Sequence, residues 1–208
     1  MYIKNTISEY DIEHANISVL FAKGIFDKKE YDKFVKMDKK TRNVKIGLLI
    51  KEKKFIYDII QEGFKEYIEE FILQNKLDPE NNIVEINHDA VWVTGRIPKK
   101  TKFDNIVFRQ KQTYTSYYGI KIKGNLFKIY INTMTDDYGV RNFTPNNIEI
   151  FNEILDILRD YEFEDNEKVY ERLHALLRRK VPDINYEREL IIGVKNETIF
   201  RKMIKDLI

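Results

Sequence analysis

The sequence predicts an α+β protein, with an antiparallel sheet and helices grouped before and after it. Apolar residues recur at helical spacing from about 53 to 75, which is typical of an amphipathic helix. Residues 83–95 and 104–131 are rich in Val, Ile, Tyr and Thr, the residue types that favour strands. Because strands and helices follow one another in blocks and do not alternate regularly, the pattern favours the α+β class.

The first half of the chain predicts a strand followed by helices. Residues 1–12 form the expected strand, and a short apolar helix ends near Gly24. Two short basic helices are expected within residues 28–50, around "KKEYDKFVKM" and "KKTRNVKIGLLI". The long helix at 53–75 ends before Pro79, because proline does not continue a helix.

The second half predicts a hairpin, further strands and a helical tail. "IVEINHDAVWVTG", residues 83–95, indicates two short strands around Asn87, His88 and Asp89. Gly124-Asn125 is a plausible two-residue turn between strands, and "MTDDYG", residues 134–139, is expected to be a loop. Amphipathic helices follow Pro145, so we expect one domain at 1–144 and a helical subdomain at 145–208.

Composition limits the function classes. The chain has 208 residues with 43% hydrophobic residues, enough for one core with a small appended subdomain. It has no cysteine, which excludes disulfides and thiolate metal sites. No apolar run reaches about 18 residues, and the N-terminus lacks a basic region followed by an apolar one. We therefore expect a cytoplasmic protein that has no membrane partner.

Charge is distributed unevenly along the chain. Residues 28–54 hold eleven Lys and Arg against four acids, and residues 96–128 hold nine against one. Residues 145–167 reverse the balance, with eight acids and one arginine. Two basic segments could form an anion-binding face, for which nucleic acid is the obvious partner. The alternative is a set of solvated lysine-rich faces with no ligand.

Asp11 and Asp89 are the candidate catalytic residues. Asp11 stands at the end of the first predicted strand and Asp89 at the tip of the hairpin, so their carboxylates converge if both strands share a sheet. Two such carboxylates suit a pair of Mg²⁺ ions, because Mg²⁺ takes its other ligands from water and substrate phosphates. The alternatives are a helix cap for Asp11 and a turn residue for Asp89.

Both aspartates lie in segments that resemble motifs of template-dependent DNA polymerases. "DIEHANISVL" resembles motif A: Asp11, Ser18 and Val19 match the family B form, and Asp11, Ile17, Val19 and Leu20 match the family A form. "HDAVWV" resembles motif C, with Asp89 at the position of the catalytic aspartate and Ala90 in place of Ser or Glu.

The resemblance implies a polymerase palm, and with it a role for each region. The helices at 28–50 would correspond to fingers, and Arg42 and Lys45 would hold the incoming triphosphate. Residues 53–75 would be the palm helix and the tail a thumb. "KQTY" resembles the Lys-x-Tyr element that contacts the primer. Five residues would then form the surface for primer–template DNA: Arg109, Lys111, Tyr114, Lys121 and Lys123.

The leading hypothesis is nucleotidyl transfer by a minimal DNA-polymerase-like palm with two Mg²⁺ ions. The chain lacks the Lys-x-x-x-Asn-Ser-x-Tyr-Gly segment of polymerase fingers. This absence favours an alternative, a non-catalytic nucleic-acid-binding or regulatory protein that retains a palm-like fold. Under the leading hypothesis, a partner protein could supply the missing polymerase elements. A third hypothesis is a metal-dependent nuclease. The Lys-, Ile- and Asn-rich composition is typical of an AT-rich genome such as that of a phage.

Overall fold

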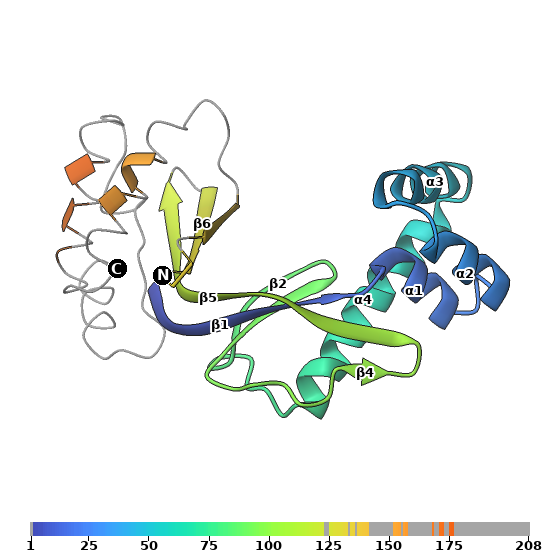
Figure 1. The fold of residues 1–208 in the computed structure, drawn as a ribbon, viewed down its shortest axis with the longest axis horizontal. Helices are drawn as coiled ribbons and strands as arrows, with labels where there is room; N and C mark the ends of the chain where they lie inside the picture. Colours follow the sequence, from blue (N-terminus) through green and yellow to red (C-terminus); the bar gives the residue numbers. More distant parts are fainter. Residues whose placement is uncertain are drawn as a thin grey trace. The chain divides into compact units, whose positions relative to one another are not determined.

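The computed structural model describes residues 2–122, 125–132, 134–135 and 137–141, with the helical residues 152–154, 156–157, 168, 171–172 and 175–176. Figure 1 shows the elements. They follow the chain as β1(Tyr2–Ile12), α1(Ala15–Ala22), α2(Lys28–Val35), α3(Lys39–Glu52), α4(Phe55–Gln74), β2(Ile83–Asn87), β3(Ala90–Thr94), β4(Lys102–Phe103), β5(Ile106–Ile122), β6(Asn125–Asn132) and β7(Asp137–Arg141). The α+β class is confirmed, as are the helices and the hairpin expected within residues 1–95.

The chain forms two compact units, residues 7–113 and residues 1–6 with 114–208. We call them the N-terminal and the C-terminal unit. In the N-terminal unit the strand order is β2-β3-β1-β5, with β4 paired to β5, and in the C-terminal unit β5 is followed by β6 and β7. The boundary thus falls within β5. The helical subdomain expected at 145–208 lies largely outside the described residues and stays a prediction.

The core of the N-terminal unit lies between α4 and one face of the sheet. Side chains of α4 such as Ile60, Phe64 and Phe71 are buried there against Tyr10 of β1 and Phe108 of β5. Neighbouring residues of a strand point to opposite faces, so Glu9 and Asp11 face away from this core. Figure 1 shows α4 crossing the strands β1 and β5 obliquely, with α1, α2 and α3 gathered near its N-terminal end.

α1 crosses α4 at Gly63, and this crossing requires a residue without a side chain. A Cβ atom at Gly63 would collide with Cγ1 of Val19, which is fully buried. The close approach brings the N-terminus of α1 next to the N-terminal half of α4. It therefore fixes one wall of the cavity described below.

The two basic helices begin at aspartate caps. Asp27 accepts a hydrogen bond from the Glu30 backbone amide (2.7 Å), and Glu30 accepts one from the Asp27 amide (3.1 Å), which is a capping box at the start of α2. Asp38 accepts from the Thr41 amide (3.0 Å) at the start of α3. α3 is held by few buried side chains, since Ile46 is its buried residue.

One alternative and two local expectations are wrong. Asp11 is not a helix cap, because α1 starts four residues later with His14 as its N-cap. Asn125 is not a turn residue but pairs with Ile122 in the β5–β6 ladder. Part of "MTDDYG" is a strand, because Asp137–Arg141 pairs with β6 as β7. In each case backbone pairing between strands, with β3 for Asp11 and across the adjacent hairpins for the other two, overrides the local preference.

Candidate functional site: a cavity at the edge of the sheet

Asp11 and Asp89 lie at the same edge of the sheet. β1 and β3 are antiparallel, and Asp11 pairs with Ala90, the residue after Asp89. The Ile12 amide donates a hydrogen bond to the Asp89 carbonyl (3.0 Å), which ties the hairpin tip to the end of β1. The two aspartates, far apart in sequence, thus converge as the shared sheet predicts.

The hairpin tip itself is unusual for a two-residue turn. His88 has a φ of 52°, a left-handed conformation that glycine or asparagine adopts at less cost. Its Nδ1 lies 3.4 Å from Oε1 of Gln61 on α4. This contact places the tip against the helix and directs the following residue, Asp89, toward the cavity.

The aspartates open into a cavity of about 550 Å³. Its walls come from β1, α1, α3, α4, the hairpin tip and β5, all within the N-terminal unit. The polar lining residues are Asp11, His14, Asn16, Lys39, Arg42, Asn43, Tyr57, Gln61, His88, Asp89 and Arg109. The apolar floor includes Ile60 and Phe64 of α4. Carboxylates, cations and an apolar floor therefore share one space.

Burial makes the charge of Asp89 unfavourable. Burial raises the pKa of the Asp89 carboxyl above its usual value, and the neighbouring Asp11 carboxylate raises it further. Its own backbone amide and the cation of Lys111 act in the opposite direction. The site thus holds two carboxylates that repel each other in a partly desolvated place.

Part of the cavity wall carries positive charge. Burial lowers the pKa of His14, and the guanidinium groups of Arg42 and Arg109 lower it further, against the opposing effect of Glu13. His14 also has a φ of 51° and its side chain makes no capping hydrogen bond to α1. The start of α1 has no acidic residue in its first turn, so this wall presents cations and backbone amides together.

Asp11 already contacts two cations. Its Oδ1 accepts a hydrogen bond from Nε of Arg109 at 3.0 Å, and its Oδ2 lies 3.7 Å from Nζ of Lys111. Lys111 also pairs with Glu9 at 2.9 Å, and the Glu9 side chain is only 3% exposed. Pairing with these cations offsets part of the negative charge at this edge of the sheet.

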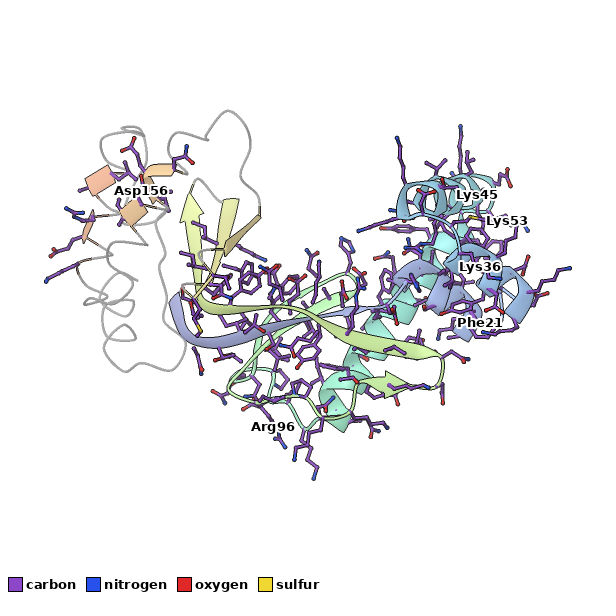
Figure 2. The ribbon with its side chains drawn as sticks, viewed as in Figure 1. Phe21, Lys36, Lys45, Lys53, Arg96 and Asp156 are labelled. Atoms are coloured by element: carbon purple, nitrogen blue, oxygen red, sulfur yellow. The ribbon has the colours of Figure 1, made fainter. Side chains whose placement is uncertain are left out.

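The other predicted residues are placed as follows. Arg42 lines the cavity, whereas Lys45 is exposed on α3 and does not line it (Figure 2). Tyr114 is buried at 4% exposure, and its ring centroid lies 5.0 Å from that of Tyr130. Lys121 lies in β5, and Lys123 is outside the described residues.

Sequence reasoning missed several lining residues. Lys39, Asn43, Ile46 and Ile50 share one face of α3 with Arg42, and their helical spacing could have identified this face. Arg109 was assigned to the nucleic-acid surface, but it also lines the cavity and pairs with Asp11. His14 has no sequence signal other than its place three residues after Asp11.

The described residues contain neither a cluster of three metal-ligating side chains nor a helix that could span a membrane. No group of three or more histidine, aspartate or glutamate side chains in that part of the chain gathers closely enough to hold a metal ion. No helix in the described ranges combines the length and the apolar character that spanning a membrane requires.

Comparison with known proteins gives a family. No curated protein matches the sequence, and no solved structure matches it. Residues 1–205 match the family described as "Bacteriophage PBS1 gene 130 protein". The link to a phage is therefore confirmed at the level of the family. This chain belongs to the bacteriophage PBS1 gene 130 protein family.

Proposed function

We propose that the cavity performs template-dependent nucleotidyl transfer onto a nucleic-acid 3′ end. The observation that carries this proposal is the meeting of Asp11, Asp89 and Arg42 in one cavity, from β1, the hairpin tip and α3. Carboxylates beside a cationic wall are what a magnesium-bound triphosphate requires, since its phosphates need cations and its metal needs oxygen ligands.

The donor set fits Mg²⁺ that is completed by substrate. Asp11 and Asp89 supply two carboxylates, and Mg²⁺ commonly binds through one or two carboxylates with water and phosphate oxygens. Burial and the nearby Asp11 raise the pKa of Asp89, so a divalent cation would relieve the repulsion there. When bound, such ions lower the pKa of an attacking hydroxyl and stabilise the leaving oxygen.

The remaining lining residues would bind and orient the nucleotide. Arg42 can hold phosphate oxygens through two parallel N–H groups, and Lys39 adds a second positive charge on the same helix. The uncapped start of α1 offers backbone amides to the same anion. The apolar floor at Ile60 and Phe64 excludes water from the space that a base or sugar would occupy.

The test is primer extension with Mg²⁺ and all four deoxynucleotide triphosphates. We expect Asp11→Asn and Asp89→Asn each to lower the rate by about a hundredfold or more, because a metal ligand contributes several kcal/mol to such a reaction. Asp104→Asn is the matched control, because Asp104 is an exposed aspartate outside the cavity. Extension that survives both cavity substitutions contradicts the proposal.

A second function, nucleic-acid binding without catalysis, is favoured by the ion pairs of Asp11. Arg109 and Lys111 occupy the carboxylate that a metal would need. A protein of this kind binds primer–template DNA with an affinity that falls steeply with salt, and it extends no primer at any Mg²⁺ concentration. Degradation of labelled DNA without added nucleotide would instead indicate a nuclease at the same carboxylates.

A partner protein belongs to the first proposal. The polymerase fingers segment is absent from the sequence, and a second protein could complete the nucleotide site at α3. If extension appears only when other phage replication proteins are added, this part of the proposal is supported. If the purified chain extends primers by itself, no partner is needed.

A further inference from the structure

A second basic surface lies at the far end of α4, away from the cavity. It consists of Lys76, Arg96, Lys99 and Lys100, all of them exposed, which we call the basic cluster. Lys76 follows α4, and the other three belong to residues 95–101, the loop between β3 and β4. The cavity residue Gln61 and the cluster are separated by about 20 Å along the helix, at 1.5 Å per residue. Figure 2 shows Arg96 at the periphery of the unit.

The loop is held rigidly by a buried asparagine. Asn75 is 6% exposed, and its Oδ1 accepts hydrogen bonds from the amides of Lys99 and Lys100, both at 2.8 Å. Its Nδ2 donates to the carbonyls of Phe71 (2.9 Å) and Lys100 (2.7 Å). Every polar position of the amide is thereby used. The loop therefore presents its lysines in a fixed arrangement, with little further loss of backbone entropy on binding.

The cations of the cluster are not neutralised within the described residues. None of the four lies within 4.0 Å of an aspartate or glutamate oxygen in that part of the chain. Arg96 donates to the Lys76 carbonyl (2.8 Å), and Lys100 donates to Gln74 (3.2 Å), so both contacts are to neutral groups. Asp78, close in sequence, accepts a hydrogen bond from the amide of Glu80 in its own turn (2.9 Å).

Lys76 occupies a backbone position that disfavours lysine. Its φ is 52°, and its backbone amide donates a hydrogen bond to the Leu73 carbonyl (3.0 Å). This is a left-handed residue at the C-terminal end of a helix, a position where glycine is usually found. A side chain in this conformation lowers stability relative to glycine. The position therefore carries a charge at the expense of backbone strain, and the helix dipole, which favours a cation at this end, is the structural alternative that the second variant below tests.

We propose that the basic cluster binds the phosphate backbone of double-stranded nucleic acid. Phosphates supply the closely spaced anions that several fixed cations need, and such contacts do not require base recognition. One large apolar side chain of the loop, Ile97, is exposed, at 79%. This is too little apolar surface for lasting attachment to a lipid bilayer. The proposal does not rest on the proposed function, because no member of the cluster lines the cavity.

The test measures binding of a fluorescein-labelled 20-base-pair DNA duplex by anisotropy over a series of NaCl concentrations. We expect Lys99→Gln/Lys100→Gln to weaken binding about tenfold and to reduce the slope of log affinity against log salt by about 2, since each phosphate contact contributes about 0.9. The matched control is Lys29→Gln/Lys33→Gln, which removes two exposed lysines from α2. The control should bind like the unchanged chain.

Lys76→Gly gives a second, independent measurement. The Tm should rise by about 2–4 °C because the left-handed strain is removed, while affinity for the duplex should fall. The backbone carbonyl that Arg96 contacts remains in this variant. A merely structural role for the cluster at the helix end predicts a loss of stability with unchanged DNA binding, and that result overturns the proposal.

Other outcomes are equally decisive. Equal loss of affinity in the loop and control variants means that only net charge matters, and the proposal is wrong. If Lys99→Gln/Lys100→Gln loses binding to phosphatidylserine vesicles while its affinity for the DNA duplex is unchanged, the basic cluster is a lipid-binding surface and the proposal is wrong. A variant with both Asp11→Asn and Asp89→Asn should keep the cluster-dependent DNA binding, so failure of the cavity proposal leaves this one standing.

Discussion

The two ends of α4 hold their polar groups in opposite ways. At the C-terminal end, the buried Asn75 amide satisfies every donor and acceptor that it has. At the N-terminal end, the cavity partly buries the Asp89 carboxylate near that of Asp11, and this burial raises the pKa of Asp89. The hydrogen bonds of Asn75 stabilise the fold and position a loop. The partly buried carboxylate of Asp89 opposes folding, and it lies in the cavity for which we propose binding of a ligand.

Asn75→Ala should produce the largest change in stability, because it removes the fully hydrogen-bonded amide at the C-terminal end of α4. Four hydrogen bonds are lost, and the amides of Lys99 and Lys100 lose their acceptor. We expect a loss of about 3 kcal/mol in the free energy of unfolding, measured by urea denaturation. Gln74→Ala, at the exposed neighbouring position, is the control and should change stability little. Similar values for the two variants would contradict the role given to Asn75.

Gly63→Ala tests the packing that joins the two ends. The added methyl group meets Val19 at the crossing of α1 and α4, so we expect a loss of about 2 kcal/mol. Gly47→Ala in α3 is a matched control, because open space surrounds that position. It should gain about 0.5–1 kcal/mol from helix propensity. Equal changes in the two variants would mean that the crossing is not close-packed.

Asp89→Asn tests the unfavourable end and should give the smallest change, of opposite sign. Because the folded pKa is raised, the ionised carboxylate opposes folding at neutral pH. The contribution of the Asp89 carboxyl to stability is fully present below its unfolded pKa of about 3.9 and is lost as pH rises through the folded pKa. Asp89→Asn should therefore raise the Tm at pH 7 and leave it unchanged near pH 3. A lower Tm at pH 7 would refute this account.

The sequence predicts those parts of the fold whose signal is local. The helical spacing of Ile56, Ile60 and Phe64 and the proline at 79 indicate α4 within a few residues. β7 was missed, because a short polar strand such as Asp137–Arg141 owes its conformation to pairing with β6. The same limit applies at the turn between β5 and β6. Two successive pairs, residues 123–124 and residues 124–125, both suit a two-residue hairpin turn, and the local sequence does not decide between them.

The candidate site was predictable in part, because the strands that carry its two aspartates have a local sequence signal. Asp11 and Asp89 converge because each stands at the end of a strand, and antiparallel pairing of β1 with β3 follows from one shared sheet. The ion pair between Arg109 and Asp11 joins residues 98 positions apart. Such a pair depends on the register of β5, which no local pattern determines. Lys39 and His14 enter the cavity through the packing of helices, which sequence spacing alone does not give.

The left-handed conformation at Lys76 has a consequence for the evolution of this family. Selection for folding favours glycine at this position, and selection for binding favours a positive charge. Relatives in which the basic loop loses its lysines should therefore drift toward glycine or asparagine at position 76. Relatives that keep the loop lysines should exchange Lys76 only for arginine.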